Sequence, residues 1–246
     1  MQFSGKTVLL RSASALAMLL LAACAQQPTQ PTAQTVNRPA VMTKEAQTQV
    51  SADQALQILK DGNARFVSGS TFNYDTPMQI KTTGTEGQFP FVHIVSCIDS
   101  RSAPAQVFDL GVGDAFSSRV AGNIVNEDIL GSLEYGAKVS GAKLIVILGH
   151  TSCGAVKGAC DNVAMGNLTG LLQKIRPAVD ATPHRHGPDR SSNNAPFVNA
   201  VAEQNVHLTV QGLLDKSPVL RDMVAKNEVK VVGAMLDIKT GQVQFY

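Results

Sequence analysis

The sequence has little net charge, no apolar run of membrane-spanning length and no complete dinucleotide-binding motif. Lys and Arg total 21 against 19 Asp and Glu, and two of the cations lie within residues 1–23, so the rest of the chain balances at 19 minus 19, or zero. This balance argues against a nucleic-acid partner. Gly111 and Gly113 lack the third glycine of a dinucleotide-binding fingerprint, so they predict only a tight turn.

The apolar stretch from Ala13 to Leu21 follows two cations and is too short to cross a bilayer, which is typical of a secretory signal. It ends in Leu-Ala-Ala-Cys24, which resembles the lipobox of bacterial lipoproteins. We therefore expect residues 1–23 to be removed and Cys24 to carry a lipid that anchors the protein to the periplasmic face of a bacterial membrane. The alternative is an ordinary signal peptide cut after Ala23, which would leave a soluble periplasmic protein.

The rest of the chain divides into a tether and one domain. Residues 24–50 are rich in Gln, Thr and Pro and show no helical or strand period, which predicts a flexible tether. Residues 51–246 have the length of one domain, and the apolar content of 44% is enough to close a single core. The sequence shows no internal repeat and no second domain.

Helical and strand patterns alternate along this domain. Ser51 is a plausible N-cap for a helix through Val67, and we also expect helices at 124–139 and 195–214. Continuous apolar runs at 91–96, 143–148 and 229–236 indicate strands buried on both faces. A turn at Gly241 allows residues 242–246 to form a hairpin partner. We therefore predict an α/β fold, with a mainly parallel sheet covered by helices and a C-terminal antiparallel edge strand.

Cysteine is scarce, and its count argues against a disulfide framework. Without Cys24 three cysteines remain, an odd number in an oxidising compartment. Metal binding explains Cys97 and Cys153, because coordination keeps a thiolate occupied. The alternative is a disulfide between Cys153 and either Cys97 or Cys160. Without such a bond, Cys160 is expected to be a small buried apolar residue.

Metal-binding residue types follow two of the predicted strands. Cys97 and Asp99 come directly after the first strand, and His150 and Cys153 follow the second. Ligands in open α/β sheets bind outside the carboxyl ends of the strands, so the two strand ends could converge on one ion. Two thiolates and an imidazole are ligands that Zn²⁺ favours, and three protein ligands leave a fourth position open, as in catalytic zinc sites.

At these motifs the chain resembles the β-class carbonic anhydrases over about residues 51–246. The resemblance implies one Zn²⁺ per subunit, held by Cys97, His150 and Cys153, and reversible hydration of carbon dioxide to bicarbonate and a proton by a zinc-bound hydroxide. It also implies a homodimer or larger oligomer with the active site at the subunit interface. The matching segments are Cys97-Ile-Asp-Ser-Arg101, His150-Thr-Ser-Cys-Gly154, Gly113-Asp-Ala-Phe116, Arg119, Ala121-Gly-Asn123, Ser132-Leu-Glu-Tyr135, Asn205-Val206 and Gly233-Ala-Met-Leu-Asp237.

The family's Asp and Arg at the positions of Asp99 and Arg101 form a pair. This implies that Arg101 holds Asp99 ionised and turned away from zinc, where Asp99 accepts the hydrogen bond of the hydroxide. A purely structural ion pair is the alternative. In one branch of the family the Asp becomes a fourth zinc ligand and closes the site. That branch has a Trp where this chain has Ile94, and the chain contains no Trp, although Arg119 matches the Arg of that branch. We therefore expect an open site.

Four further residues match substrate contacts of the family. Gln88 matches a Gln that reaches bicarbonate from the neighbouring subunit, and Phe116 and Tyr135 match residues that line an apolar cleft. Ordinary core packing is the alternative for both aromatic residues. Gly154 would donate its backbone N–H toward the bound oxygen at the positive end of the following helix.

The remaining histidines are less informative. His184 and His186 lie in a polar stretch with Pro and Gly, so we expect them to be solvated, with a proton-shuttle role as the alternative. His93, in a strand, and His207, in a helix, are expected to be structural.

Two other functions stay open from the sequence alone. The same zinc site could hydrolyse a sulfur analogue of carbon dioxide, such as carbonyl sulfide or carbon disulfide. A non-catalytic exported zinc-binding domain is the other possibility, and the intact pair of Asp99 and Arg101 argues against it.

Overall fold

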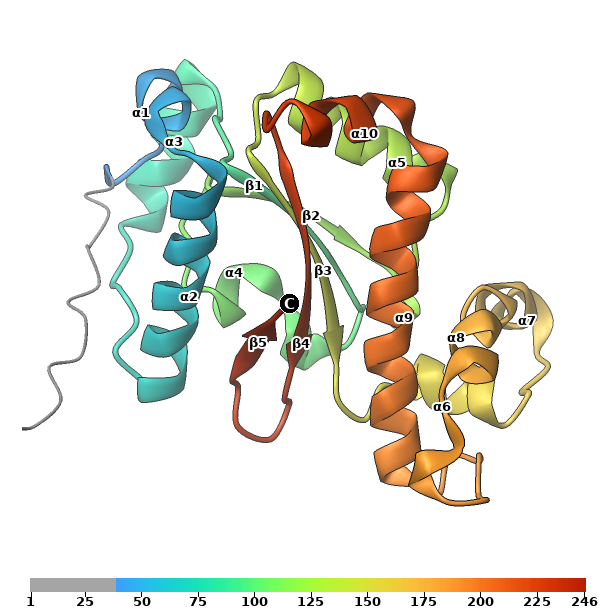
Figure 1. Cartoon of the computed structure of the whole chain (residues 1–246). Coiled ribbons are helices and arrows are strands. Elements are labelled where there is room, and N and C mark those ends of the chain that lie inside the picture. The colour runs from blue at the N-terminus through green and yellow to red at the C-terminus, as the bar shows by residue number, and fades with distance from the viewer. Residues whose placement is uncertain (1–38) are drawn as a thin grey trace, which may run out of the picture. The chain divides into compact units, whose positions relative to one another are not determined.

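The computed structural model describes residues 39–246, so the expected signal segment, Cys24 and most of the expected tether lie outside the described residues. A five-stranded sheet in the order β2-β1-β3-β4-β5 forms the centre of the described part (Figure 1). Strands β1 to β4 are parallel, and β5 pairs antiparallel with β4, so the predicted fold class is confirmed. The strands are β1 (Val92–Ser96), β2 (Ala115–Arg119), β3 (Leu144–His150), β4 (Lys230–Leu236) and β5 (Val243–Phe245).

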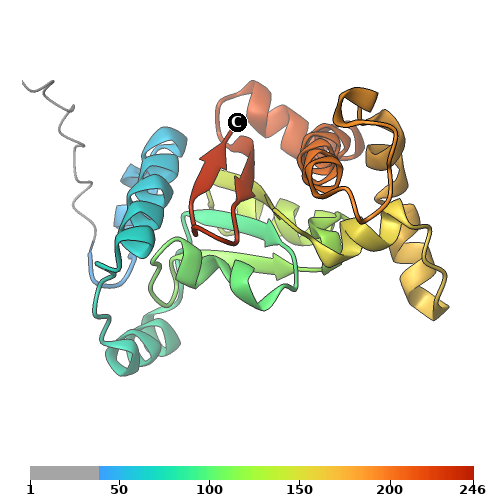
Figure 2. The ribbon, with the colours of Figure 1, turned by 90° about the horizontal axis from the view of Figure 1, so that it is seen from below.

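Helices cover both faces of the sheet, as the view from below shows (Figure 2). One apolar core lies between the sheet and helices α1, α2 and α4, and the other lies between the sheet and helices α5 to α10. Within the described residues, none of the helices combines the length and apolar character needed to cross a bilayer. The helices are α1 (Lys44–Gln49), α2 (Ala52–Ser68), α3 (Thr76–Glu86), α4 (Pro104–Val107), α5 (Glu127–Glu134), α6 (Gly154–Cys160), α7 (Gly166–Gln173), α8 (Arg176–Ala181), α9 (Ala195–Lys216) and α10 (Pro218–Ala225).

The central strands are buried on both faces, which explains their continuous apolar sequence. On β3, Leu144 and Val146 face one core while Ile145 and Ile147 face the other. Alternate residues of a strand point to opposite faces, so a strand in the middle layer needs apolar side chains at every position. Because β1 and β3 are adjacent and parallel, their carboxyl ends lie side by side.

Local signals set the start and end of the predicted first helix. Ser51 and Gln54 form a reciprocal capping box, in which each side chain accepts a hydrogen bond from the backbone N–H of the other residue. Gly69 ends the helix in the left-handed region, with φ 70°. The helix at Ala52–Ser68 therefore agrees with the prediction to within one residue.

The domain begins earlier than the sequence predicted. Residues 44–49 form α1 inside the expected tether, and Met42 is only 2% exposed. The buried Gln47 side chain donates from Nε2 to the carbonyl oxygens of Pro90 (2.7 Å) and Ser140 (2.8 Å). These contacts tie the segment to the start of β1 and to the end of the α5 region, so the expected tether ends before Met42.

Two other elements differ from the prediction. Strand β2, whose sequence is Ala-Phe-Ser-Ser-Arg, has no continuous apolar run because it lies at the edge of the sheet and is only partly buried. The expected helix at 124–139 starts later, at Glu127 behind the N-cap Asn126, and ends in a π-helical turn over Tyr135–Val139.

Candidate metal centre

Three of the predicted metal ligands converge at the carboxyl ends of β1 and β3. Cys97 follows the last residue of β1, His150 is the last residue of β3, and Cys153 is the N-cap of α6. One ligand atom from each residue lies within 4.8 Å of the other two, and all three residues are buried. The parallel pairing of β1 with β3 thus unites ligands that are 53 and 56 positions apart in the chain.

The ring of His150 is oriented to offer a lone pair to a metal ion. Its Nδ1 lies 2.9 Å from the carbonyl oxygen of Thr151, and since a carbonyl can only accept, Nδ1 carries the proton. Nε2 is then the unprotonated nitrogen, and it is buried without a hydrogen-bond partner among the described residues. Buried polar atoms normally have partners, so the two sulfurs and this nitrogen fit a thiophilic ion such as Zn²⁺.

The pKa values of the two thiols are shifted in opposite directions. The neighbouring Cys153 thiol, with smaller contributions from His150 and from the backbone N–H groups of Asp99 and Gly122, lowers the pKa of Cys97 to about 4. The Cys97 sulfur and burial in turn raise the pKa of Cys153. Burial lowers the pKa of His150, but the Cys97 sulfur, the Thr151 carbonyl oxygen and the charge of Asp99 together outweigh it, so the net pKa lies above the ordinary value. A metal cation bound by the two sulfurs and the imidazole would displace their shared protons, because metal ligands bind in the deprotonated form.

Residues of the surrounding frame fix the ligands through backbone hydrogen bonds. The backbone N–H of Gly122 donates to Cys97 Sγ at 3.4 Å, and Asn205 Nδ2 donates to the Gly122 carbonyl at 2.9 Å. Ser152, at φ 58°, donates its N–H to Asn199 Oδ1 at 2.8 Å. Gly122, Ser152 and Asn205 lie in the segments that carry the family resemblance, but the sequence assigned them no contact because their partners lie far away in the chain.

Asp99 and Arg101 form the predicted pair beside the cluster. Asp99 Oδ1 accepts hydrogen bonds from the backbone N–H (3.0 Å) and Nε (2.9 Å) of Arg101, and Oδ2 accepts from Nη2 at 2.7 Å. These bonds from Arg101 hold the pKa of Asp99 well below its ordinary value, and Asp99 raises the pKa of Arg101 in return. The carboxylate therefore faces Arg101 and does not belong to the three-ligand cluster.

The expected substrate contacts are not gathered at the cluster within this chain. Phe116 pairs in register with His93, four residues before Cys97, which places it about 13 Å along the strand from the cluster. Its ring lies 6.4 Å from that of Tyr135, and both line an open cleft of about 700 Å³. Tyr135 is 56% exposed, so it is not a core residue.

The two other expected contacts lie in different places. Gln88 is exposed on the segment that leads into β1. Gly154 is the first residue of α6, next to Cys153, and its Cα has open space around it. Only Gly154, of the four expected substrate contacts, is therefore beside the ligands in the described chain.

The remaining predicted features have structural roles or none. His93 is buried, its Nε2 lies 2.9 Å from Ser118 Oγ, and burial lowers its pKa to about 4. His207 is exposed on α9 against the ring of Tyr246, and His184 is exposed in a short 3₁₀ turn over His184–His186. The side chain of His186 lies outside what the structure describes. Cys97, Cys153 and the buried Cys160 are all free thiols, which excludes the alternative disulfides in this structure.

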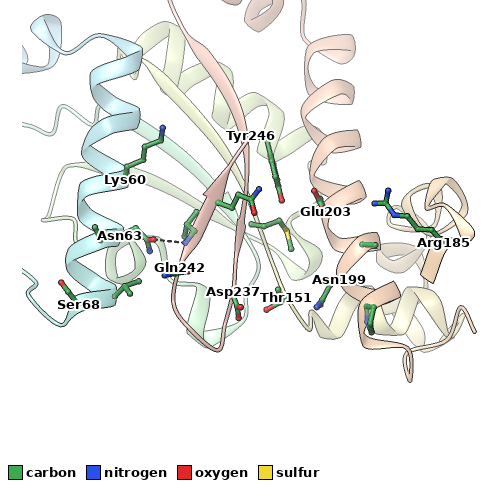
Figure 3. A pocket seen from close by; sticks show the side chains of 17 residues that line it. Lys60, Asn63, Ser68, Thr151, Arg185, Asn199, Glu203, Asp237, Gln242 and Tyr246 are labelled. Carbon is green, nitrogen blue, oxygen red and sulfur yellow. Dashed lines mark hydrogen bonds between the residues drawn. The ribbon is translucent and has the colours of Figure 1, made fainter. Parts of the chain in front are cut away.

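A separate pocket of about 790 Å³ lies between α2, the β4–β5 hairpin and α9 (Figure 3). Lys60 and Asn63 point into it from α2, and Asn199 and Glu203 line it from α9. None of the three ligand side chains lines this pocket. It approaches the cluster through Thr151, whose carbonyl oxygen orients His150, and through Asn199, which accepts a hydrogen bond from the N–H of Ser152.

Comparisons with known proteins agree with this geometry. A family model described as carbonic anhydrase matches residues 92–243. Carbonic anhydrase 2 of Mycobacterium tuberculosis is 33% identical over 193 residues, which cover 76% of this chain and 89% of the relative. The β-carbonic anhydrase CafA of Aspergillus fumigatus matches with a TM-score of 0.61 and 26% identity over 79% of this chain and 89% of that one. One of two tetrameric β-carbonic anhydrases of Sordaria macrospora, 24% identical, shares the fold with a TM-score of 0.60 over 78% of this chain and 96% of that one. The chain therefore belongs to the β-class carbonic anhydrases.

Proposed function

We propose that this chain catalyses the zinc-dependent, reversible hydration of carbon dioxide to bicarbonate and a proton. One observation carries the proposal: Cys97, His150 and the N-cap Cys153 converge beside a carboxylate that Arg101 already holds. A structural zinc site needs no such carboxylate, and structural sites are closed by four ligands. Family membership supports the same reaction.

The three converging residues would hold the ion through two sulfurs and His150 Nε2. Zn²⁺ held by these residues would act as a Lewis acid and would lower the pKa of a water molecule from about 15.7 toward about 7. Thr151 fixes the tautomer of His150 through its carbonyl oxygen, as second-shell acceptors commonly do for zinc-binding histidines. The N–H of Gly122 donates a hydrogen bond to the Cys97 sulfur.

Asp99 is the residue that would orient the attacking water. Its pKa is well below the ordinary value because Arg101 donates to both oxygens, so the carboxylate is ionised and accepts hydrogen bonds only. Oδ1 accepts two hydrogen bonds from Arg101 whereas Oδ2 accepts one. We infer that Oδ2 accepts the hydrogen bond of the attacking water, which turns a lone pair of that water toward carbon dioxide.

The test combines zinc content with stopped-flow hydration of carbon dioxide between about pH 7 and about pH 9. Cys153→Ser should lose zinc and activity, whereas Cys160→Ser, which changes a buried cysteine outside the cluster, should keep both. Asp99→Ala should keep zinc and lose activity, and Asp222→Ala on α10 is its control. A zinc-loaded protein that does not hydrate carbon dioxide contradicts the proposal, and sulfide release from carbonyl sulfide by that protein would favour the alternative reaction.

We further propose that the active unit is a homodimer in which each subunit completes the site of the other. The support is the surface of the described chain: Tyr135, which lines the same cleft as Phe116, is 56% exposed, and Val139, on the same helical turn as Tyr135, is 70% exposed. Gln88 is exposed as well. Large apolar side chains that are exposed on the same helical turn, as Tyr135 and Val139 are, favour a contact surface.

A mixed dimer tests this arrangement. Subunits that carry Cys153→Ser lack a metal site but keep Gln88, and subunits that carry Gln88→Ala keep the metal site. If Gln88 acts across the interface, mixing the two should restore activity, since one site of each mixed dimer has all its parts. Absence of recovery in a proven mixed dimer, or a monomer by sedimentation, contradicts the proposal.

Export and lipidation remain proposals that rest on the sequence of residues 1–24. Mass spectrometry of the protein isolated from a bacterial membrane should show an N-terminal Cys24 that carries a diacylglycerol. An unmodified N-terminus in the soluble periplasmic fraction would favour the ordinary signal peptide.

A further inference from the structure

Arg119 ends the edge strand β2, and its side chain is bonded to the chain segment that follows β1. Nε donates to the carbonyl oxygen of Cys97 at 3.1 Å, and Nη2 donates to the carbonyl oxygen of Asp99 at 2.6 Å. One guanidinium therefore bridges the backbone of the first metal ligand and the backbone of the carboxylate residue. We call residues 97–99 the ligand turn.

Other bonds also hold the ligand turn: the Ser102 N–H donates to the Asp99 carbonyl oxygen at 2.9 Å, and the Gly122 N–H donates to Cys97 Sγ at 3.4 Å. Ile98, its middle residue, is 63% exposed, so packing does not fix it. Ser102 Oγ lies 3.0 Å from the Cys97 carbonyl oxygen and 2.9 Å from that of Asp99, but a hydroxyl has one proton and serves one carbonyl at a time. The planar fork of Arg119 serves both carbonyls at once with charge-assisted bonds.

The backbone of Arg119 is itself well fixed. It pairs in register with Ser96, and the next N–H, that of Val120, donates to the Ser96 carbonyl at 3.0 Å. The His93 ring ties the neighbouring Ser118 to β1 at 2.9 Å. The guanidinium thus extends from a rigid base, which suits a group that sets the conformation of a short turn.

We propose that Arg119 is a positioning residue, which keeps the Cys97 sulfur toward the other two ligands and the Asp99 carboxylate toward Arg101. The inference rests on the proposed function, because it assigns Asp99 a place outside the metal coordination. Without the fork, the Asp99 carbonyl keeps the Ser102 N–H and the Cys97 carbonyl keeps at most the Ser102 hydroxyl, so the turn loses both of its charge-assisted bonds and gains freedom to rotate. The Asp99 carboxylate then reaches the open coordination position and occupies it.

Cobalt substitution tests this without measuring turnover. Co²⁺ accepts the same ligands as Zn²⁺, and its visible absorption reports which ligands it has. In the wild-type protein and in Arg221→Ala, an exposed control on α10, added thiocyanate should bind the open position and change the spectrum. Arg119→Ala should bind thiocyanate at least about tenfold more weakly, because Asp99 competes for that position.

Two more variants separate this role from a general loss of structure. Asp99→Asn combined with Arg119→Ala should recover the thiocyanate response, since an amide is a poor ligand. Arg119→Lys, which can reach one carbonyl only, should lie between the wild type and Arg119→Ala, and it carries the test if Arg119→Ala does not fold. Loss of cobalt by a folded Arg119→Ala supports the same role through Cys97.

The outcomes that overturn the inference are distinct from a failure of the proposed function. A thiocyanate response of folded Arg119→Ala equal to that of Arg221→Ala overturns it, and so does a double variant that recovers nothing. If the zinc-loaded wild type does not hydrate carbon dioxide, the proposed function is wrong. The cobalt result for Arg119 stays valid in that case.

Discussion

Gly122 donates its N–H to the Cys97 sulfur, and its backbone has a left-handed conformation that is unfavourable for other residues. Gly122→Ala therefore tests how the site is supported. The φ of Gly122 is 70°, and a left-handed alanine costs about 1–2 kcal/mol. An added Cβ would lie 2.5 Å from Cδ1 of Ile175, a fully buried side chain, and overpacking of this kind costs about 1–3 kcal/mol. The two terms together predict a loss of about 2–5 kcal/mol in the free energy of unfolding.

Thermal unfolding by circular dichroism measures this loss. For a domain of this size, a loss of about 3 kcal/mol lowers Tm by about 6–12 °C. Zinc affinity should fall as well, because the Gly122 N–H that supports Cys97 Sγ is displaced. Gly131→Ala is the matched control: this residue lies inside α5 with no neighbouring atom within 4 Å, and the change should be neutral or stabilising by about 0.5–1 kcal/mol. A Tm for Gly122→Ala within about 2 °C of the wild type would refute the reasoning.

Three further predictions follow from buried polar and apolar contacts. His93 has a folded pKa of about 4, below its unfolded value, so the unfolded state takes up a proton first as the pH falls and stability is lost. His93→Gln should therefore lose about 2 kcal/mol less than the wild type between about pH 7 and about pH 5 in urea unfolding, and equal losses would contradict this. A chain that begins at Ser51 lacks Met42 and Gln47 and should be less stable than one that begins at residue 39 by at least about 3 kcal/mol, whereas equal melting would mean that α1 is dispensable. Asn205→Ala leaves a buried carbonyl without its donor and should cost about 1–3 kcal/mol, so a change under about 0.5 kcal/mol would count against that bond.

Predictions from the sequence were accurate where a local pattern carries the information. The helix behind Ser51 is fixed by a capping box and a C-terminal glycine, both of which are short-range signals. The strands at Val92–Ser96 and Leu144–His150 were recognisable because burial on both faces demands an unbroken apolar run. The antiparallel last strand, β5, was marked by the turn at Gly241.

The same reasoning missed elements whose stability depends on distant partners. The edge strand β2 has a half-polar sequence, and it forms a strand only because its backbone hydrogen-bonds to β1 in a parallel pair. Helix α1 consists of six mostly polar residues, too few to be stable alone, and it is held by Gln47 across more than 40 and more than 90 positions of sequence.

For the candidate site, the sequence by itself determined the chemistry of the ligands. Cysteine and histidine at two strand ends, with Asp99 and Arg101 beside them, predicted a zinc site because residue type and distance from the end of a strand are both local properties. Only the tertiary structure decided which hydrogen bonds support the ligands and which of the predicted site residues lie away from them. Hydrogen bonds from Arg119, Gly122 and Asn205 orient the ligands across the fold, and Phe116 lies away from the cluster, because side-chain bonds and strand register are set by the packing of segments far apart in sequence.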